Sequence, residues 1–109
     1  MTPEELYERL ARYAASQGIQ LNKDRAYVLD IMRGLLKNEE RYGYRSCPCR
    51  LAAGTRERDN DIICPCAYRD PDLKEYGSCY CGLYVTQEWN EGSRRHLSVP
   101  ERRPPERHE

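Results

Sequence analysis

Three short cysteine pairs limit what this chain can fold into more than any other feature. Each pair has the form Cys-x-Cys, and the three pairs are Cys47–Cys49, Cys64–Cys66 and Cys79–Cys81. Residues two apart in an extended segment point to the same side. The middle residue of the first two pairs is proline, which favours an extended conformation for the residue before it. Each pair can therefore present both sulfurs to one point, and three converging pairs would bring six sulfurs together.

The rest of the chain offers little apolar material for a core. Hydrophobic residues make up 39% of the 109 residues, the mean hydropathy is −0.97, and there is no phenylalanine. A chain of this length forms one domain, so we expect the cysteines to help hold the fold. Eighteen basic and eighteen acidic residues cancel. This balance disfavours a nucleic-acid-binding protein that depends on a global positive field.

No stretch of the chain reads as a targeting or membrane segment. The first residues, MTPEELYERLARY, are charged and lack the apolar run of a signal peptide. No apolar run approaches the roughly 20 residues that a membrane helix needs. We therefore expect a cytoplasmic protein with no membrane partner. In that compartment, closely spaced cysteines more often bind metal or do redox chemistry than form structural disulfides.

Helix signals dominate the first part of the chain and predict a mostly helical fold. A capping box in residues 2–5, with proline in the first turn, predicts a helix that closes at Gly18. An apolar stripe at helical spacing predicts a second helix, which begins after Asn22 and ends near Gly43. The stripe consists of Ala26, Val28, Leu29, Met32, Leu35 and Leu36.

The cysteine-bearing region, residues 44–85, is predicted to contain little regular structure. Residues 52–61 have the composition of a loop. Residues 70–77 predict a short helix with Asp70 as its cap and a glycine at its end. Residues 82–86 form the one predicted strand.

The last residues differ in composition from the rest of the chain. Residues 90–109 are charged and rich in proline, which predicts a flexible tail. The sequence therefore predicts a single domain over residues 1–89, followed by this tail.

Four interpretations of the cysteines stay open on spacing alone. A structural zinc site takes four thiolates, but its ligand pairs usually have two or more intervening residues, and two cysteines would be left over. A disulfide framework conflicts with the expected compartment. A thioredoxin-type oxidoreductase needs a Cys-x-x-Cys at the start of a helix, which the chain lacks. The fourth interpretation divides the six cysteines into four ligands of a 4Fe–4S cluster and an adjacent pair able to form a disulfide.

That fourth division has a chemical purpose. Iron–sulfur carriers deliver one electron at a time, whereas reduction of a disulfide to two thiols takes two electrons. A cluster beside the disulfide could bond one of its sulfurs until the second electron arrives. Three close pairs of cysteines would supply the ligands and the redox pair together.

Longer motifs around the pairs point to a known family. The stretches NKDRAYVLDIMRGLLKNEERYGYRSCPCR, IICPCAYR and CYCGLYV, within residues 22–85, resemble the catalytic subunit of ferredoxin:thioredoxin reductase and its bacterial and archaeal relatives. The resemblance implies a small, mostly helical, single-domain fold with short strands or none. In that fold the chain wraps around a 4Fe–4S cluster with a redox-active disulfide against it.

The resemblance also implies a role for each cysteine by its position in the motifs. The implied cluster ligands are Cys47, Cys64, Cys66 and Cys79. Cys49 and Cys81 are the implied redox-active disulfide. Cys49 would be the exposed sulfur that forms a mixed disulfide with the substrate protein, and Cys81 the inner sulfur that bonds to the cluster.

The third pair departs from the family pattern. The family normally has Cys-His-Cys there, and its histidine is thought to help with protons and charge near the disulfide, whereas this chain has Tyr80. A phenol donates a hydrogen bond but is a poor proton shuttle at neutral pH. Tyr80 is thus expected beside the ligands with its role open, and His96 is expected to be a surface residue.

The resemblance implies a disulfide reductase that takes single electrons from a ferredoxin-like donor and reduces a thioredoxin-like protein. Plant-type members carry a second, variable subunit, and the sequence does not identify a surface for one. Ferredoxins are acidic, so we hypothesise that Arg45 and Arg50, which flank the first pair, steer the donor. The alternative is a non-catalytic interaction module that is stabilised by zinc or a cluster.

Overall fold

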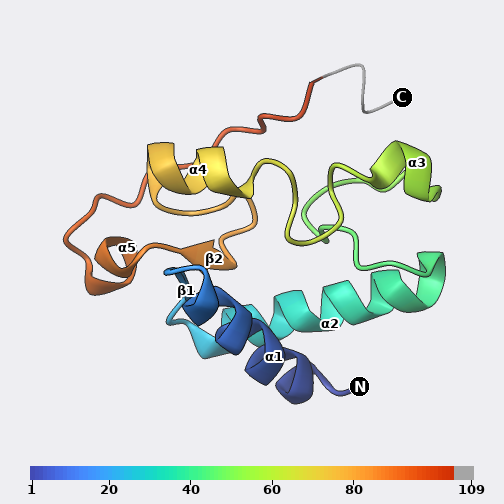
Figure 1. Cartoon of the computed structure of the whole chain (residues 1–109), viewed down its shortest axis with the longest axis horizontal. Coiled ribbons are helices and arrows are strands. Elements are labelled where there is room, and N and C mark those ends of the chain that lie inside the picture. The colour runs from blue at the N-terminus through green and yellow to red at the C-terminus, as the bar shows by residue number, and fades with distance from the viewer. Residues whose placement is uncertain (105–109) are drawn as a thin grey trace.

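Short helices and a minimal sheet make up the computed structural model, which describes residues 1–104 (Figure 1). In chain order the elements are α1 (Pro3–Ser16), β1 (Gln20–Leu21), α2 (Arg25–Tyr42), α3 (Arg56–Asp59), α4 (Arg69–Tyr76), β2 (Tyr84–Val85) and α5 (Gln87–Glu91). The prediction of a mostly helical fold with short strands is confirmed. No helix in the described residues is long and apolar enough to cross a membrane.

Local capping signals set the ends of the two long helices. The Thr2 side chain accepts from the backbone N–H of Glu5, and the Glu5 side chain accepts from the N–H of Thr2, so the predicted capping box is present at the start of α1. Asp24 caps α2 in the same way by accepting from the N–H of Tyr27. Gly43 ends α2 in the left-handed conformation, which glycine adopts without steric cost.

The core lies between the two long helices and the cysteine loops. α1 and α2 pack against each other, and α2 buries Val28, Ile31, Met32 and Leu35. The antiparallel pair β1–β2 joins the turn after α1 to the segment after the third cysteine pair. Three cysteines belong to the same buried cluster as these apolar side chains. The cysteine centre is therefore an extension of the core.

The structure differs from the sequence-based expectation at three short elements. The predicted loop over residues 52–61 contains the single-turn helix α3. Helix α4 begins at Arg69 and has no side-chain cap, so the predicted cap at Asp70 is wrong. The predicted strand is present as β2, whereas its partner β1 was not predicted.

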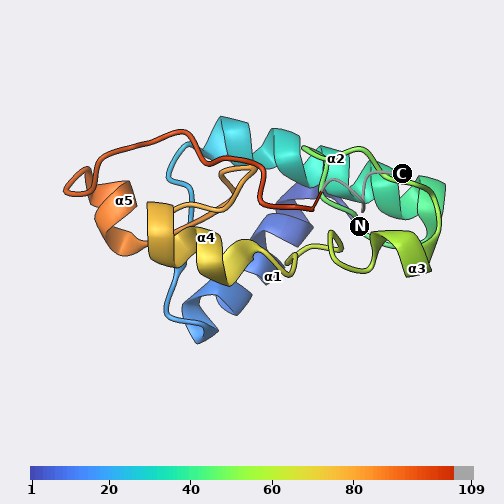
Figure 2. The same cartoon turned by 90° about the horizontal axis from the view of Figure 1, so that it is seen from above.

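The C-terminal segment returns across the molecule after α5 (Figure 2). It reaches the cysteine side, where Glu101 and Arg103 form ion pairs with Arg50 and Asp61. The molecule measures 39 × 32 × 22 Å. The division into a domain over residues 1–89 and a flexible tail stays a prediction, and residues 105–109 of that tail lie outside the described residues.

Candidate redox and metal centre

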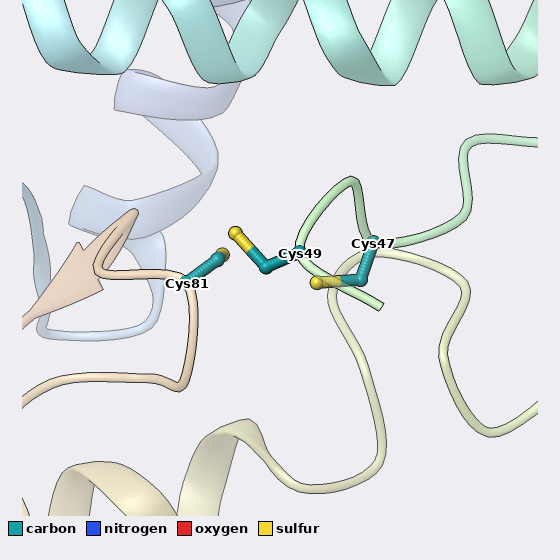
Figure 3. Close-up of side chains that lie close together, drawn as sticks. All are labelled: Cys47, Cys49 and Cys81. Carbon is teal, nitrogen blue, oxygen red and sulfur yellow. The ribbon is translucent and has the colours of Figure 1, made fainter. Parts of the chain in front are cut away.

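Three sulfurs from two separate loops meet beneath helix α2 (Figure 3). The sulfurs of Cys47, Cys49 and Cys81 all lie within 4.8 Å of one another. Cys79 adjoins this group, because its sulfur lies 3.7 Å from the sulfur of Cys81. All six cysteines carry free thiols in this structure. The first and third pairs therefore converge as the sequence predicts.

Backbone hydrogen bonds hold the first two pairs side by side. The N–H of Cys47 donates to the carbonyl of Ile62 at 2.7 Å, and the N–H of Cys64 donates to the carbonyl of Arg45 at 2.8 Å. Together with the bridge between Ser46 and Ile63, these bonds align the segments that lead into each Cys-Pro-Cys. The third pair is fixed separately, since the N–H of Cys79 donates to the carbonyl of Tyr84 at 2.9 Å.

Helix α2 is the platform on which the first pair rests. A Cβ atom at Gly34 would lie 2.8 Å from the Cβ of Pro48, so only glycine allows the helix to approach the Cys-Pro-Cys turn this closely. One turn later, the side-chain amide of Asn38 donates to the carbonyl of Ser46 at 3.0 Å. Both contacts locate the first pair relative to the helix.

A buried carboxylate orders the loop that follows the first pair. Asp59 is fully buried and accepts three hydrogen bonds. The donors are the Tyr44 hydroxyl at 2.5 Å and the N–H groups of Ala53 and Gly54 at 2.9 and 3.0 Å. These bonds tie Tyr44 and the backbone of residues 53–54 to one carboxylate, and so close the loop that carries Cys47 and Cys49. The charged sequence of this loop gave no signal that one of its carboxylates is buried.

The neighbouring sulfurs Cys49 and Cys81 differ in access to solvent. Cys49 is exposed, whereas Cys81 is 7% exposed. The Tyr27 hydroxyl donates to the carbonyl of Cys81 and holds that turn against α2. An attacking thiol must reach a protein substrate and a resolving thiol need not. Cys49 therefore has the access to solvent that the attacking role needs, and the roles of the two cysteines stay a prediction.

Hydrogen bonds among the sulfurs separate thiolates from thiols. Bonds from Cys49 and then Cys81 lower the pKa of the Cys47 thiol to about 3. A bond from Cys81 lowers the pKa of Cys79. The hydrogen bond to Cys47 raises the pKa of both partners, to about 11 for Cys49. The thiol pKa is therefore lowered at Cys47 and Cys79 and raised at Cys49 and Cys81.

The second pair lies at the border of this group. Burial raises the pKa of Cys64 and of Cys66, and the charges of Cys47 and Cys79 raise it further. Cys66 accepts from the Nη1 of Arg50 at 3.5 Å. Among residues 1–104, the group of Cys47, Cys49 and Cys81 is the one set of three metal-ligating side chains within 4.8 Å of each other. The four expected ligands do not form such a set, and their assignment stays a prediction.

The two arginines beside the first pair are both engaged in ion pairs. The Arg50 side chain is 2% exposed and bonds to Glu101, so it does not face an approaching partner, and that half of the donor-steering hypothesis is wrong. Arg45 pairs with Glu39 at 3.3 Å. His96 is exposed as expected, and its ring stacks on Trp89 with centroids 3.7 Å apart.

Cysteine pairs that converge on one buried centre in a small helical fold define a thiol-rich redox or metal protein. The family model of the ferredoxin thioredoxin reductase catalytic beta chain matches residues 2–101. The chain therefore belongs to this family, which confirms the resemblance and supports an oxidoreductase role. No curated protein matches the chain.

Proposed function

We propose that the chain is a catalytic subunit that reduces a thioredoxin-like protein through the Cys49–Cys81 pair, using single electrons from a ferredoxin-like donor. The observation that carries the proposal is the juxtaposition of an exposed Cys49 with a buried Cys81, beside the sulfurs of Cys47 and Cys79. A structural metal site of four thiolates has no need of two further cysteines next to its ligands.

The residues around the other cysteines suit a 4Fe–4S cluster. The expected ligands are Cys47, Cys64, Cys66 and Cys79. Each ligand of such a cluster binds a different iron, so these sulfurs need not approach as closely as ligands of a single ion. The N–H of Tyr84 donates to the Cys79 sulfur at 3.3 Å, and hydrogen bonds of this kind tune such sulfurs.

A buried hydroxyl gives a second indication that the centre accepts a sulfur-rich group. The Tyr84 hydroxyl is buried without a hydrogen-bond partner within the described part of the chain. It lies within reach of the Cys64 sulfur: burial raises the pKa of the Cys64 thiol, and an interaction with the Tyr84 hydroxyl lowers it in part. Buried hydroxyls normally have a partner, and a cluster sulfide or thiolate would supply one. When bound, the cluster would supply the electrons for disulfide reduction one at a time.

The thiol chemistry assigned to this chain balances in two exchanges. Cys49 gives up its thiol proton and attacks one sulfur of the substrate disulfide as a thiolate, and the other substrate sulfur leaves as a thiolate that takes up a proton. The thiolate of Cys81 then attacks Cys49, which releases the second substrate thiol and forms the Cys49–Cys81 disulfide. The substrate gains two electrons and two protons, and two single-electron transfers from the donor restore the dithiol.

Two serine variants test these roles against each other in protein purified without oxygen. Cys81→Ser should accumulate a mixed disulfide between Cys49 and a thioredoxin-like substrate, because the resolving sulfur is missing. Cys49→Ser, the matched control, should form none. Both variants should retain about four irons per chain. Loss of iron from either variant would show that the residue is a ligand and that the division is wrong.

Metal analysis separates this proposal from the alternative interaction module. A brown protein with a disulfide that a ferredoxin-like donor reduces supports the reductase. A colourless protein that holds one zinc per chain, with no reducible disulfide, would instead support the non-catalytic module.

A further inference from the structure

Arg50 places a buried positive charge directly against the cysteine centre. Its Nη1 donates to the sulfur of Cys66 at 3.5 Å, and its side chain is 2% exposed. Arginine stays protonated in proteins. A fixed cation therefore lies against one sulfur of the second cysteine pair.

The guanidinium is held by groups from three separate segments. Glu101 accepts from Nε at 2.8 Å and from Nη2 at 2.9 Å, which is the bidentate arrangement that fixes a guanidinium most firmly. The guanidinium carbon lies 4.6 Å from the ring centre of Tyr80 and 5.2 Å from that of Tyr68. Such cation–π contacts strengthen when they are desolvated. Of the three guanidinium nitrogens, Nε and Nη2 donate to Glu101 and Nη1 donates to the Cys66 sulfur.

We propose that Arg50, held by Glu101 and by the rings of Tyr68 and Tyr80, is a positioning residue that sets the reduction potential of the centre at Cys66. This inference rests on the proposed function, since it requires a redox centre bound by these cysteines. It gives the C-terminal segment and Tyr80 a part in the chemistry although neither supplies a ligand. No bond forms or breaks at Arg50.

The physical reason is a difference in charge between the two redox states. Reduction would add one electron from the donor, so the total charge of the centre and its cysteine ligands would become one unit more negative. A positive group in contact with a ligand sulfur stabilises that state more than the oxidised one, and burial limits screening by water. Arg50 therefore raises the potential, and the negative charge of Glu101 partly offsets this effect.

Opposite changes are expected from the two partners of the ion pair. In iron-loaded protein, Arg50→Gln should reduce the equilibrium constant for one-electron reduction about tenfold, a shift of about −59 mV. Glu101→Gln should shift the potential in the positive direction by a smaller amount, about threefold in the equilibrium constant. The measurement is a redox titration followed by absorbance or electron paramagnetic resonance at fixed pH. A merely structural loosening of the C-terminal segment would move both variants in the same direction.

Two further variants make the test specific. Arg45→Gln removes a positive charge at the other side of the same motif, where it pairs with Glu39 at the surface, and should leave the potential unchanged. Arg50→Lys keeps the charge and should lie closer to wild type than Arg50→Gln. If Arg50→Gln does not retain iron, the positive shift of Glu101→Gln and the position of Arg50→Lys decide the question.

The inference is overturned if Arg50→Gln and Glu101→Gln shift the potential in the same direction, if neither shifts it, or if Arg45→Gln shifts it as much as Arg50→Gln. A failure of the proposed function has a different signature, because the wild-type protein would then hold no iron or lack a reducible Cys49–Cys81 disulfide.

Discussion

Substitution of Gly34 by alanine has two opposing effects on stability: it raises the helix propensity of α2, and it places a new Cβ against Pro48. Alanine favours the helix by about 1 kcal/mol relative to glycine. However, the new Cβ would lie 2.8 Å from the Cβ of Pro48 and 3.3 Å from its Cγ. Pro48 cannot move away freely, because the backbone N–H of the preceding Cys47 donates a hydrogen bond to the carbonyl of Ile62 at 2.7 Å. Overpacking of this kind costs about 1–3 kcal/mol, so we expect a net loss of up to about 2 kcal/mol.

The loss can be measured by urea unfolding of identically prepared iron-loaded proteins. With a slope of about 2 kcal/mol per M for a small domain, a loss of 2 kcal/mol lowers the midpoint by about 1 M. The contact is tested by a double-mutant cycle with Pro48→Gly, which removes the opposing Cβ. In that background Gly34→Ala should become neutral or stabilising. A stabilising effect of Gly34→Ala in the wild-type background would refute the close approach of α2 to the first pair.

Three further predictions concern Asp59, Tyr80 and Arg103, and an exposed arginine serves as the control for the last of them. Burial opposes ionisation of Asp59, but hydrogen bonds from one hydroxyl and two backbone amides outweigh it and lower its pKa. Its charge therefore stabilises the fold above about pH 4, and this contribution disappears as the pH falls through the folded-state pKa. Asp59→Asn should remove that part of the acid dependence in a pH titration of the urea midpoint. Tyr80→Phe keeps the ring beneath Arg50 and should match wild type in urea, whereas Tyr80→Ala should lose about 1 kcal/mol. The Arg103 side chain is 2% exposed and pairs with Asp61. Arg103→Gln removes its charge and should lower the free energy of unfolding by about 2–3 kcal/mol and speed hydrogen exchange in the C-terminal segment. Arg33→Gln breaks an exposed pair and should change stability by less than about 1 kcal/mol.

Features that depend on neighbours in sequence could be predicted, and features that depend on distant partners could not. The capping box at Thr2 and the left-handed glycines at Gly43 and Gly77 are local: the first begins α1, and the glycines end α2 and α4, as expected. Helix α4 begins at Arg69, one residue before the expected cap, and the Arg69 side chain is buried against α1. Its Nη1 donates to the Tyr13 hydroxyl at 2.6 Å, and Tyr13 lies in a different helix.

The first and third cysteine pairs lie in turns, closed by hydrogen bonds from the N–H of Arg50 to the carbonyl of Cys47 and from the N–H of Gly82 to the carbonyl of Cys79, so the extended geometry expected for them is wrong. That these two pairs meet could nevertheless be predicted. Their surroundings could not, since the partners come from far along the chain. Glu101 lies 51 residues from Arg50, and the signal available in the sequence was only a charged, proline-rich tail. The contact between Gly34 and Pro48 likewise depends on how α2 crosses the loop.

Charged residues are normally expected at a solvated surface, but around the cysteine centre three of them are buried. Arg50, Asp59 and Arg103 are buried, and each makes short bonds to a partner of opposite charge or to backbone amides. Buried ion pairs contribute little net stability, because desolvation offsets their attraction. They do fix the relative positions of the two segments that they join, since displacement of one partner would leave the other as an uncompensated buried charge. In a chain with few large apolar side chains, these pairs can hold the cysteine loops and the C-terminal segment in one arrangement, which a redox centre with a separate exchange pair requires.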